Sequence, residues 1–166
     1  HLGEKIKKHF NDGSKFGIKI TYFEEDPNKP LGTAGSLYYL KSKIEEDFIL
    51  VFGDVFFSVD FNKMIAFHKS NNSDATLLTH PNSHPYDSDL VVISEDNRVK
   101  CFDSKENIRD YDYKNLVNSG IYIFSPKIFE YVNEPKKYGL EKDVIAKMIE
   151  DGDKVLSYHS TEYVKD

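Results

Sequence analysis

Cysteine is almost absent from this 166-residue chain, and basic patches and long apolar runs are absent altogether. A single cysteine, Cys101, excludes a disulfide framework and a CxxC metal site, and residues 98–102 around it are typical of a strand. The net charge of −6 and the pI near 5.5 argue against a protein that binds nucleic acid or anionic membranes. No apolar run approaches the length that crosses a membrane. We expect a cytoplasmic protein with neither kind of partner.

The chain is instead rich in apolar and aromatic side chains. Hydrophobic residues make up 39% of it, with 12 Phe and 11 Tyr, which is enough for the core of one domain. These aromatic residues are assigned to the core, because a platform for stacked nucleic-acid bases would need basic charge beside them. The sequence contains no internal repeat and no low-complexity linker. Residues 1–166 are therefore expected to belong to a single domain.

Predicted strands alternate with predicted helices along the chain. Asp60 is a candidate helix cap, and Gly152 follows the last helix as a stop signal. Apolar periodicity predicts helices over residues 2–11, 33–43, 61–68 and 140–150, a short helix from Pro126, and strands over residues 18–23, 48–52, 75–80, 90–94, 98–102, 117–124 and 155–158. This order predicts an α/β fold: a mostly parallel, Rossmann-like sheet flanked by helices, with an antiparallel hairpin insertion at residues 90–102.

A loop with two glycines lies between the predicted strand over residues 18–23 and the predicted helix over residues 33–43. Gly32 and Gly35 leave no Cβ between a ligand and the backbone, and the first turn of a helix offers unpaired N–H donors. This order favours nucleotide binding. The alternative is an ordinary turn in which Thr33 caps the helix.

An acidic residue follows the next predicted strand. Five consecutive apolar residues at 48–52 predict a strand buried on both faces, as in a parallel sheet covered by helices. Asp54 follows it after one glycine, at the strand end where α/β sheets collect ligands, and a carboxylate there can hold Mg²⁺ against phosphate oxygens. The alternative is that Asp54 is a turn residue or a cap.

Four short segments together resemble one family of enzymes. They are residues 31–37 (LGTAGSL), 52–54 (FGD), 117–124 (VNSGIYIF) and 140–145 (LEKDVI). In this order they resemble the sugar-1-phosphate nucleotidyltransferases, most closely the mannose-1-phosphate and heptose-1-phosphate guanylyltransferase branch. Residues 80–91 are similar to the heptose-type members, some of which continue into a phosphatase domain of the haloacid dehalogenase class. The resemblance covers nearly the whole chain.

The resemblance implies transfer of a nucleoside monophosphate from an NTP, with GTP suggested by the branch, to a sugar-1-phosphate with release of pyrophosphate. It implies that Asp54 and Asp166 share Mg²⁺ bound to the nucleotide phosphates. It also implies that the loop lies against the nucleobase; the loop residues concerned are Gly32, Thr33, Ala34 and Gly35. The predicted catalytic residues are Asp54, Asp166 and Lys142.

The same resemblance implies a sugar site. Asn118 and Gly120 would line it, Glu141 would accept hydrogen bonds from sugar hydroxyls, and Lys142 would attract the sugar phosphate. Taken alone, residues 118–120 are also typical of a bulge inside a strand, where glycine commonly marks irregular pairing. Glu141 and Lys142 are also ordinary residues for the first turn of a helix.

The chain departs from the family pattern at both ends. It contains neither the glycine-rich loop G-G-x-G-T-R-L nor the later K-P lysine, and residues 1–6 resemble a helix downstream of that loop. Residues 163–166 resemble the start of the D-x-G-T-P segment, whose aspartate is Asp166. We therefore expect a partial domain with negligible turnover by itself. For the full-length protein, the resemblance leaves open a homo-oligomer and a fused phosphatase domain.

Other readings compete with this one. His80 and His84 have the spacing of a zinc pair, but each precedes a proline and no third ligand is near, which disfavours zinc. Asp87 and Asp89 form the D-x-D pattern that holds the metal in nucleotide-sugar glycosyltransferases. A third reading is a non-catalytic regulatory subunit that keeps the nucleotidyltransferase fold to bind partners or nucleotide-sugars.

Overall fold

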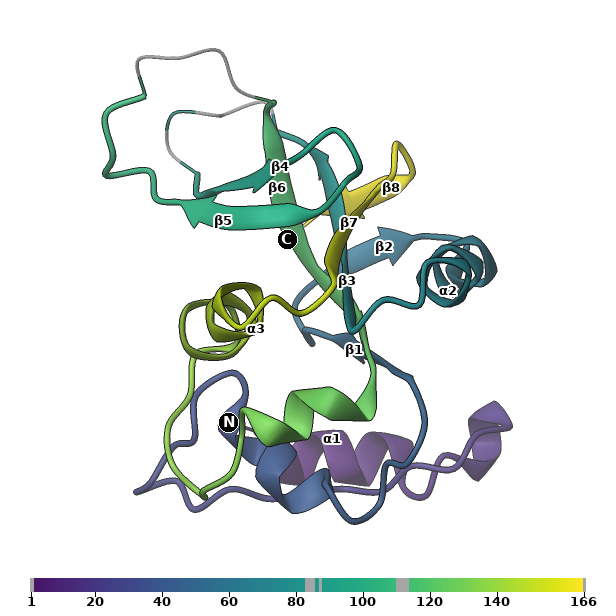
Figure 1. Cartoon of the computed structure of the whole chain (residues 1–166). Helices are drawn as coiled ribbons and strands as arrows, with labels where there is room; N and C mark the ends of the chain where they lie inside the picture. The colour runs from purple at the N-terminus through teal and green to yellow at the C-terminus, as the bar shows by residue number, and fades with distance from the viewer. Residues whose placement is uncertain (1, 83–85, 87, 110–113, 166) are drawn as a thin grey trace.

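The centre of the protein is a four-stranded sheet in the order β1-β6-β3-β7 (Figure 1). The computed structural model describes residues 2–82, 86, 88–109 and 114–165. The strands of the sheet are β1 (Phe48–Val51), β6 (Leu116–Phe124), β3 (Ala75–Pro81) and β7 (Val155–His159). β6 is antiparallel to β1 and to β3, whereas β3 and β7 are parallel.

The predicted α/β class is confirmed, but the sheet is mixed. β1, β3 and β7 run in one direction, as the expectation of a mostly parallel sheet requires, yet β6 runs against them and lies between β1 and β3. The β3–β7 pairing is therefore the parallel one within the described sheet. Strand direction is set by the connections, and the apolar pattern of a strand does not record it.

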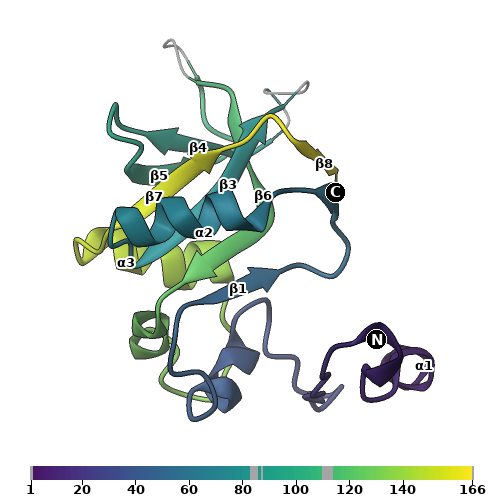
Figure 2. The same ribbon diagram turned by 90° about the vertical axis from the view of Figure 1, so that its right-hand side faces the viewer.

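Helices cover both faces of the sheet. α2 (Phe61–Ser70) and α3 (Ala146–Glu150) lie on opposite sides of it in Figures 1 and 2. The predicted cap of α2 is confirmed, because the Asp60 side chain accepts a hydrogen bond from Asn62 N at 3.0 Å. The predicted helix over residues 140–150 is also confirmed, with its first half wound as a π-helix (Leu140–Ile145) before α3.

The two faces of the sheet form two cores with the alternation of a β-strand. Leu77 and Tyr122 belong to the core on the α3 side, together with Met148. Leu78 and Ile121, the neighbours of the first pair along the chain, belong to the core on the α2 side. The sheet is thus the middle of three layers.

The predicted hairpin is confirmed as β4 (Leu90–Ile93) and β5 (Val99–Asp103), which pair antiparallel above the sheet. Cys101 lies in β5, as predicted, and is exposed. The short helix predicted from Pro126 is a 3₁₀-helix, Pro126–Glu130. No helix in the described part of the chain is both long and apolar enough to cross a membrane.

A second small sheet escaped the sequence patterns. β2 (Phe56–Ser58) pairs antiparallel with β8 (Tyr163–Lys165), and Phe56 lies opposite Lys165. Each strand has only three residues, too few for a period of two to stand out. Their pairing joins segments more than a hundred positions apart in the sequence.

The N-terminal part of the chain differs most from prediction. α1 (Gly3–Phe10) confirms the first predicted helix, and a short 3₁₀-helix, Ser14–Phe16, follows it. The strand predicted over residues 18–23 does not form, because Ile18 N and Ile20 N donate to carbonyls of the preceding turn instead of to a partner strand. Of the helix predicted over residues 33–43, only the 3₁₀-helix Gly35–Leu40 is present.

The expectation that residues 48–52 are buried on both faces is also wrong. β1 is at the edge of the described sheet, and its residues alternate between half-buried and exposed. Ile49 and Val51 are each 37% exposed. The face of β1 from which these two side chains project is therefore only partly covered by the described chain.

Candidate functional site

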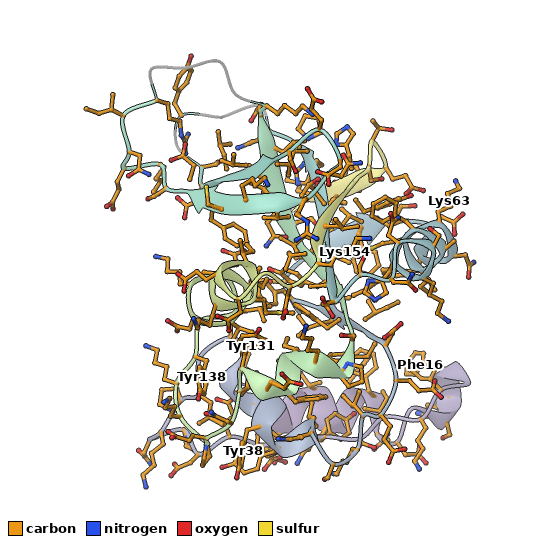
Figure 3. All side chains as sticks on the ribbon, viewed as in Figure 1. Phe16, Tyr38, Lys63, Tyr131, Tyr138 and Lys154 are labelled. Atoms are coloured by element: carbon orange, nitrogen blue, oxygen red, sulfur yellow. The ribbon has the colours of Figure 1, made fainter. Side chains whose placement is uncertain are left out.

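The glycine loop is fastened to the segment that leads into the last helix. Tyr138 N donates to Leu31 O at 3.0 Å, and Ala34 N donates to Tyr138 O at 3.1 Å. One turn further, Leu140 N donates to Thr33 Oγ1 at 2.8 Å. Figure 3 labels Tyr138 in this part of the molecule. These three hydrogen bonds hold the two segments together, although about a hundred residues separate them.

Both glycines of the loop are required by this packing. A Cβ at Gly32 would lie 2.4 Å from Tyr138 O, and one at Gly35 would lie 2.3 Å from Lys136 O. Gly32 also has a φ of +72°, which side chains disfavour. Thr33 does not cap the helix, since its hydroxyl binds Leu140. Gly32 and Thr33 are exposed, whereas Ala34 and Gly35 are buried in the protein.

The loop thereby positions Glu141, the residue after Leu140. Asn118 Nδ2 donates to Glu141 Oε1 and to Tyr122 Oη. The Tyr122 hydroxyl donates to the same Glu141 oxygen at 3.2 Å. The structure thus brings together Asn118 and Glu141, two residues predicted for the sugar site. Tyr122 was missed, because it lies in an apolar run and is typical of a core residue.

A bulge in β6 explains how Asn118 and Tyr122 reach the same carboxylate. Leu77 pairs with Tyr122 and Thr79 with Asn118, so two steps on β3 face four steps on β6. The extra residues lie around Gly120, which has a φ of +72°. The bulge predicted as the alternative for residues 118–120 is therefore confirmed. This bulge shortens the strand locally, so that the side chains of Asn118 and Tyr122, four positions apart, converge.

Gly120 also holds the turn that carries Asp54. Phe52 N donates to Gly120 O at 2.9 Å. A Cβ at Gly120 would lie 3.0 Å from Phe52 Cδ2 and 3.2 Å from Val55 Cγ2. The Phe52 ring meets the Tyr122 ring edge-on, with centroids 5.6 Å apart. The turn that carries Asp54 therefore packs, through Gly120, against the cluster formed by Asn118, Tyr122 and Glu141.

A polar cavity of about 370 Å³ opens beside Asn118 and Glu141. His80, Phe102 and Lys105 also line it, and the Asn118 Oδ1 atom is buried without a hydrogen-bond partner. The cavity is of the size that holds small ligands. Lys142 does not line this cavity.

Lys142 lies on the other side of Glu141. It is exposed and lines a second cavity of about 310 Å³, together with Lys100 of β5. Glu141 borders both cavities. Of the predicted sugar-site residues, the structure therefore places Asn118 and Glu141 at the first cavity and Lys142 at the second.

Asp54 lies exposed in the turn between β1 and β2. The pairing of Phe56 with Lys165 brings the C-terminal end of β8 alongside this turn. Asp166 lies outside the described residues, and the shared metal site stays a prediction. Among the residues that are described, no group of three or more His, Cys, Asp or Glu could hold a metal ion. An exposed carboxylate is nevertheless a fitting ligand for Mg²⁺, which binds one or two carboxylates together with substrate phosphates.

A mixed α/β sheet that brings together a glycine loop, an acidic turn and a polar cavity defines an α/β domain with a candidate ligand site. The chain belongs to the nucleotidyl transferase family, whose model matches residues 1–165. It is 31% identical over 163 residues to the mannose-1-phosphate guanylyltransferase of Mycobacterium tuberculosis, covering 97% of this chain and 44% of that protein. It is 33% identical over 146 residues to the D-glycero-alpha-D-manno-heptose 1-phosphate guanylyltransferase of Aneurinibacillus thermoaerophilus, covering 87% and 60%.

Another curated relative is named for UTP, and a solved structure with low sequence identity shows the similarity of the fold. The UTP–glucose-1-phosphate uridylyltransferase of Synechocystis is 28% identical over 164 residues, covering 92% of this chain and 42% of that protein. The crystal structure of HddC from Yersinia pseudotuberculosis superposes with a TM-score of 0.77 at 23% identity, over 99% of this chain and 68% of that chain. The chain thus spans less than half the length of two of these curated relatives.

Proposed function

We propose that the full-length protein transfers a nucleoside monophosphate from GTP to a sugar-1-phosphate of the mannose or heptose type. A phosphate oxygen of the sugar forms a bond to the α-phosphorus of the nucleotide, the bond to pyrophosphate breaks, and an NDP-sugar results. The observation that carries this proposal is the Asn118–Glu141 pair at the cavity, joined to the glycine loop through Leu140 and to the Asp54 turn through Gly120. Family membership supplies the reaction class.

The cavity beside β6 is assigned to the sugar. The Glu141 carboxylate accepts hydrogen bonds, which suits sugar hydroxyls, and the buried Asn118 Oδ1 offers a second acceptor. Lys142 is exposed at the neighbouring cavity, where its charge can attract the phosphate as the sugar enters. On this assignment the sugar ring would lie between β6 and the start of the last helix.

The exposed part of the glycine loop is assigned to the nucleobase. Gly32 and Thr33 are open to solvent. Ala34 and Gly35 are buried, and their backbone N–H groups donate to Tyr138 O and Leu31 O, which fixes the loop to the protein. Asp54 and Asp166 would hold Mg²⁺, which neutralises charge on the phosphates when bound. The protein's remaining task is to align two anions, because phosphoryl transfer depends mainly on positioning and charge. We place this reaction in the cytoplasm.

The test is pyrophosphate release by the full-length protein, with each of four NTPs paired with mannose-, heptose- and glucose-1-phosphate in the presence of Mg²⁺. We expect the highest kcat/KM with GTP and a mannose-type sugar. Asp54→Asn should lower kcat at least a hundredfold, whereas Asp96→Asn, at an exposed hairpin residue, should not. Absence of release with every pair would overturn the proposal. A higher kcat/KM with UTP than with GTP would change the proposed nucleotide and leave the proposed reaction in place.

The two competing functions predict other outcomes. In a glycosyltransferase, Asp87 and Asp89 would hold the metal, so Asp54→Asn would leave Mg²⁺ binding unchanged. The structure gives Asp89 another role, because its Oδ1 accepts a hydrogen bond from Lys105 N at 2.9 Å. Asp87 lies outside the described residues. A regulatory subunit would bind nucleotide or nucleotide-sugar without releasing pyrophosphate.

A further inference from the structure

The two oxygens of the Glu141 carboxylate have different surroundings. Oε1 receives hydrogen bonds from both Asn118 Nδ2 and the Tyr122 hydroxyl. No residue that the structure describes donates to Oε2. Because a carboxylate with one oxygen fixed by two donors cannot rotate freely, the direction of the second oxygen is also fixed.

The Tyr122 hydroxyl is a rigid donor. Tyr122 is fully buried, and its ring packs against Phe52 at 5.6 Å and Phe124 at 5.5 Å between centroids. Burial and the nearby Glu141 carboxylate raise the pKa of the Tyr122 phenol far above its usual value. The hydroxyl therefore keeps its proton, and the ring cannot turn away from Glu141.

We propose that Tyr122 is a positioning residue that orients the Glu141 carboxylate, so that its free oxygen faces the cavity and accepts hydrogen bonds from a sugar hydroxyl. This inference rests on the proposed function, because it gives Glu141 the sugar as its ligand. Tyr122 itself is covered by the protein and contacts the sugar only through Glu141. The bulge at Gly120 serves the same end, since it brings Asn118 close enough to donate to both the Tyr122 hydroxyl and the shared oxygen.

The experiment is Tyr122→Phe in the full-length protein, which removes one oxygen and keeps the ring. We expect the KM for the sugar phosphate to rise about tenfold, as for loss of one hydrogen bond to a charged group. The KM for the nucleotide and kcat should change less than about twofold. The matched control is Tyr131→Phe: the Tyr131 hydroxyl also donates to a carboxylate, Asp153 Oδ2 at 2.8 Å, but borders neither cavity. It should leave all three constants unchanged.

A double-mutant cycle separates positioning from general loss of packing. In a Glu141→Ala background, Tyr122→Phe should have no further effect on the KM for the sugar phosphate. A tenfold effect that persists without Glu141, or equal effects on both KM values, would overturn the proposal. So would an unchanged KM for the sugar phosphate in the single variant.

Crystal structures of the wild type and of Tyr122→Phe keep this inference separate from the proposed function. The Glu141 carboxylate should turn in the variant and stay in place in the wild type. If the wild type releases no pyrophosphate with any sugar phosphate, the proposed function fails, and with it the sugar as the ligand of Glu141. A carboxylate that keeps its orientation in the variant would instead overturn the positioning role, whatever the activity.

Discussion

Leu140 N donates a hydrogen bond of 2.8 Å to Thr33 Oγ1, across 107 positions of the sequence. This bond joins the loop that we assign to the nucleobase to the segment that carries Glu141, which we assign to the sugar. The two halves of the proposed site therefore share one support. Movement of either half would be transmitted to the other through Leu140.

Thr33→Val tests this support, because valine keeps the shape of threonine and removes the hydroxyl. We expect the free energy of unfolding to fall by about 1–2 kcal/mol, since Leu140 N loses its partner. Urea unfolding of the purified chain measures this. Thr33→Ser keeps the oxygen and should lie within about 0.5 kcal/mol of the wild type. Equal losses in both variants would show that the hydroxyl contributes nothing.

Gly35→Ala should destabilise the protein by about 2 kcal/mol, because the new Cβ would lie 2.3 Å from the backbone oxygen of Lys136. Backbone cannot move aside as a flexible side chain does. Gly53→Ala is the control, since a Cβ there would meet no atom within 4 Å. We expect a change below about 0.5 kcal/mol for it. A tolerated Gly35→Ala would contradict the close packing of the loop on residues 136–140.

Gly120→Ala should weaken both halves of the proposed site. Besides the cost of a side chain at φ +72°, the Cβ would press on Phe52 and Val55, which carry the Asp54 turn. In the full-length protein we expect the KM values for nucleotide and sugar phosphate to rise together. Gly152→Ala is the control, because Gly152 also has a positive φ, +87°, but a Cβ there would meet no atom within 4 Å. It should cost about 1 kcal/mol of stability and leave both KM values unchanged.

The pH dependence of stability should carry a contribution from His68. This side chain is 1% exposed, its Nδ1 lies 2.8 Å from Thr76 Oγ1, and burial lowers its pKa below 6.5 despite the opposing effect of Asp47. Below pH 6.5, His68 binds a proton in the unfolded chain but stays neutral in the folded chain until the pH reaches its lowered pKa. Stability should therefore fall as the pH drops from 6.5 toward the lowered pKa of His68.

Urea unfolding between about pH 8 and pH 5.5 measures this contribution. His68→Gln removes the titrating group, so its unfolding free energy should fall less steeply with acidification than that of the wild type. His159→Gln, at an exposed position, should keep the wild-type slope. A wild-type slope in His68→Gln would show that His68 does not carry the effect.

Elements with complete local signals could be predicted from the sequence. α2 has its cap at Asp60 and an apolar face, and the β4–β5 hairpin has two apolar runs around a polar turn. The strand over residues 18–23 has the right alternation, yet it fails to form because strand pairing needs a partner that the pattern cannot supply. The direction of β6 and the β2–β8 pairing depend on distant partners for the same reason.

The site was predictable only in part. Asn118 and Glu141 were found through their family motifs, and the structure brings them together. Tyr122 could not be found, because it lies in an apolar run typical of a core strand, and the apolar pattern does not show that a bulge at Gly120 shortens β6 and brings Tyr122 to Asn118. The alternative role of Thr33 as a helix cap is wrong, because the partner of its hydroxyl, Leu140, lies 107 positions away in the sequence.

The position of β6 between β1 and β3 has a dynamic consequence. Amide protons at Tyr122 and Ile123, which are paired with both neighbouring strands, should exchange with deuterium only when the whole domain opens. The glycine loop has no strand partner, and exposed amides such as that of Gly32 should exchange early. We therefore expect hydrogen exchange to be slowest in β6, beside the cavity that we assign to the sugar, and faster at the exposed residues of the loop that we assign to the nucleobase.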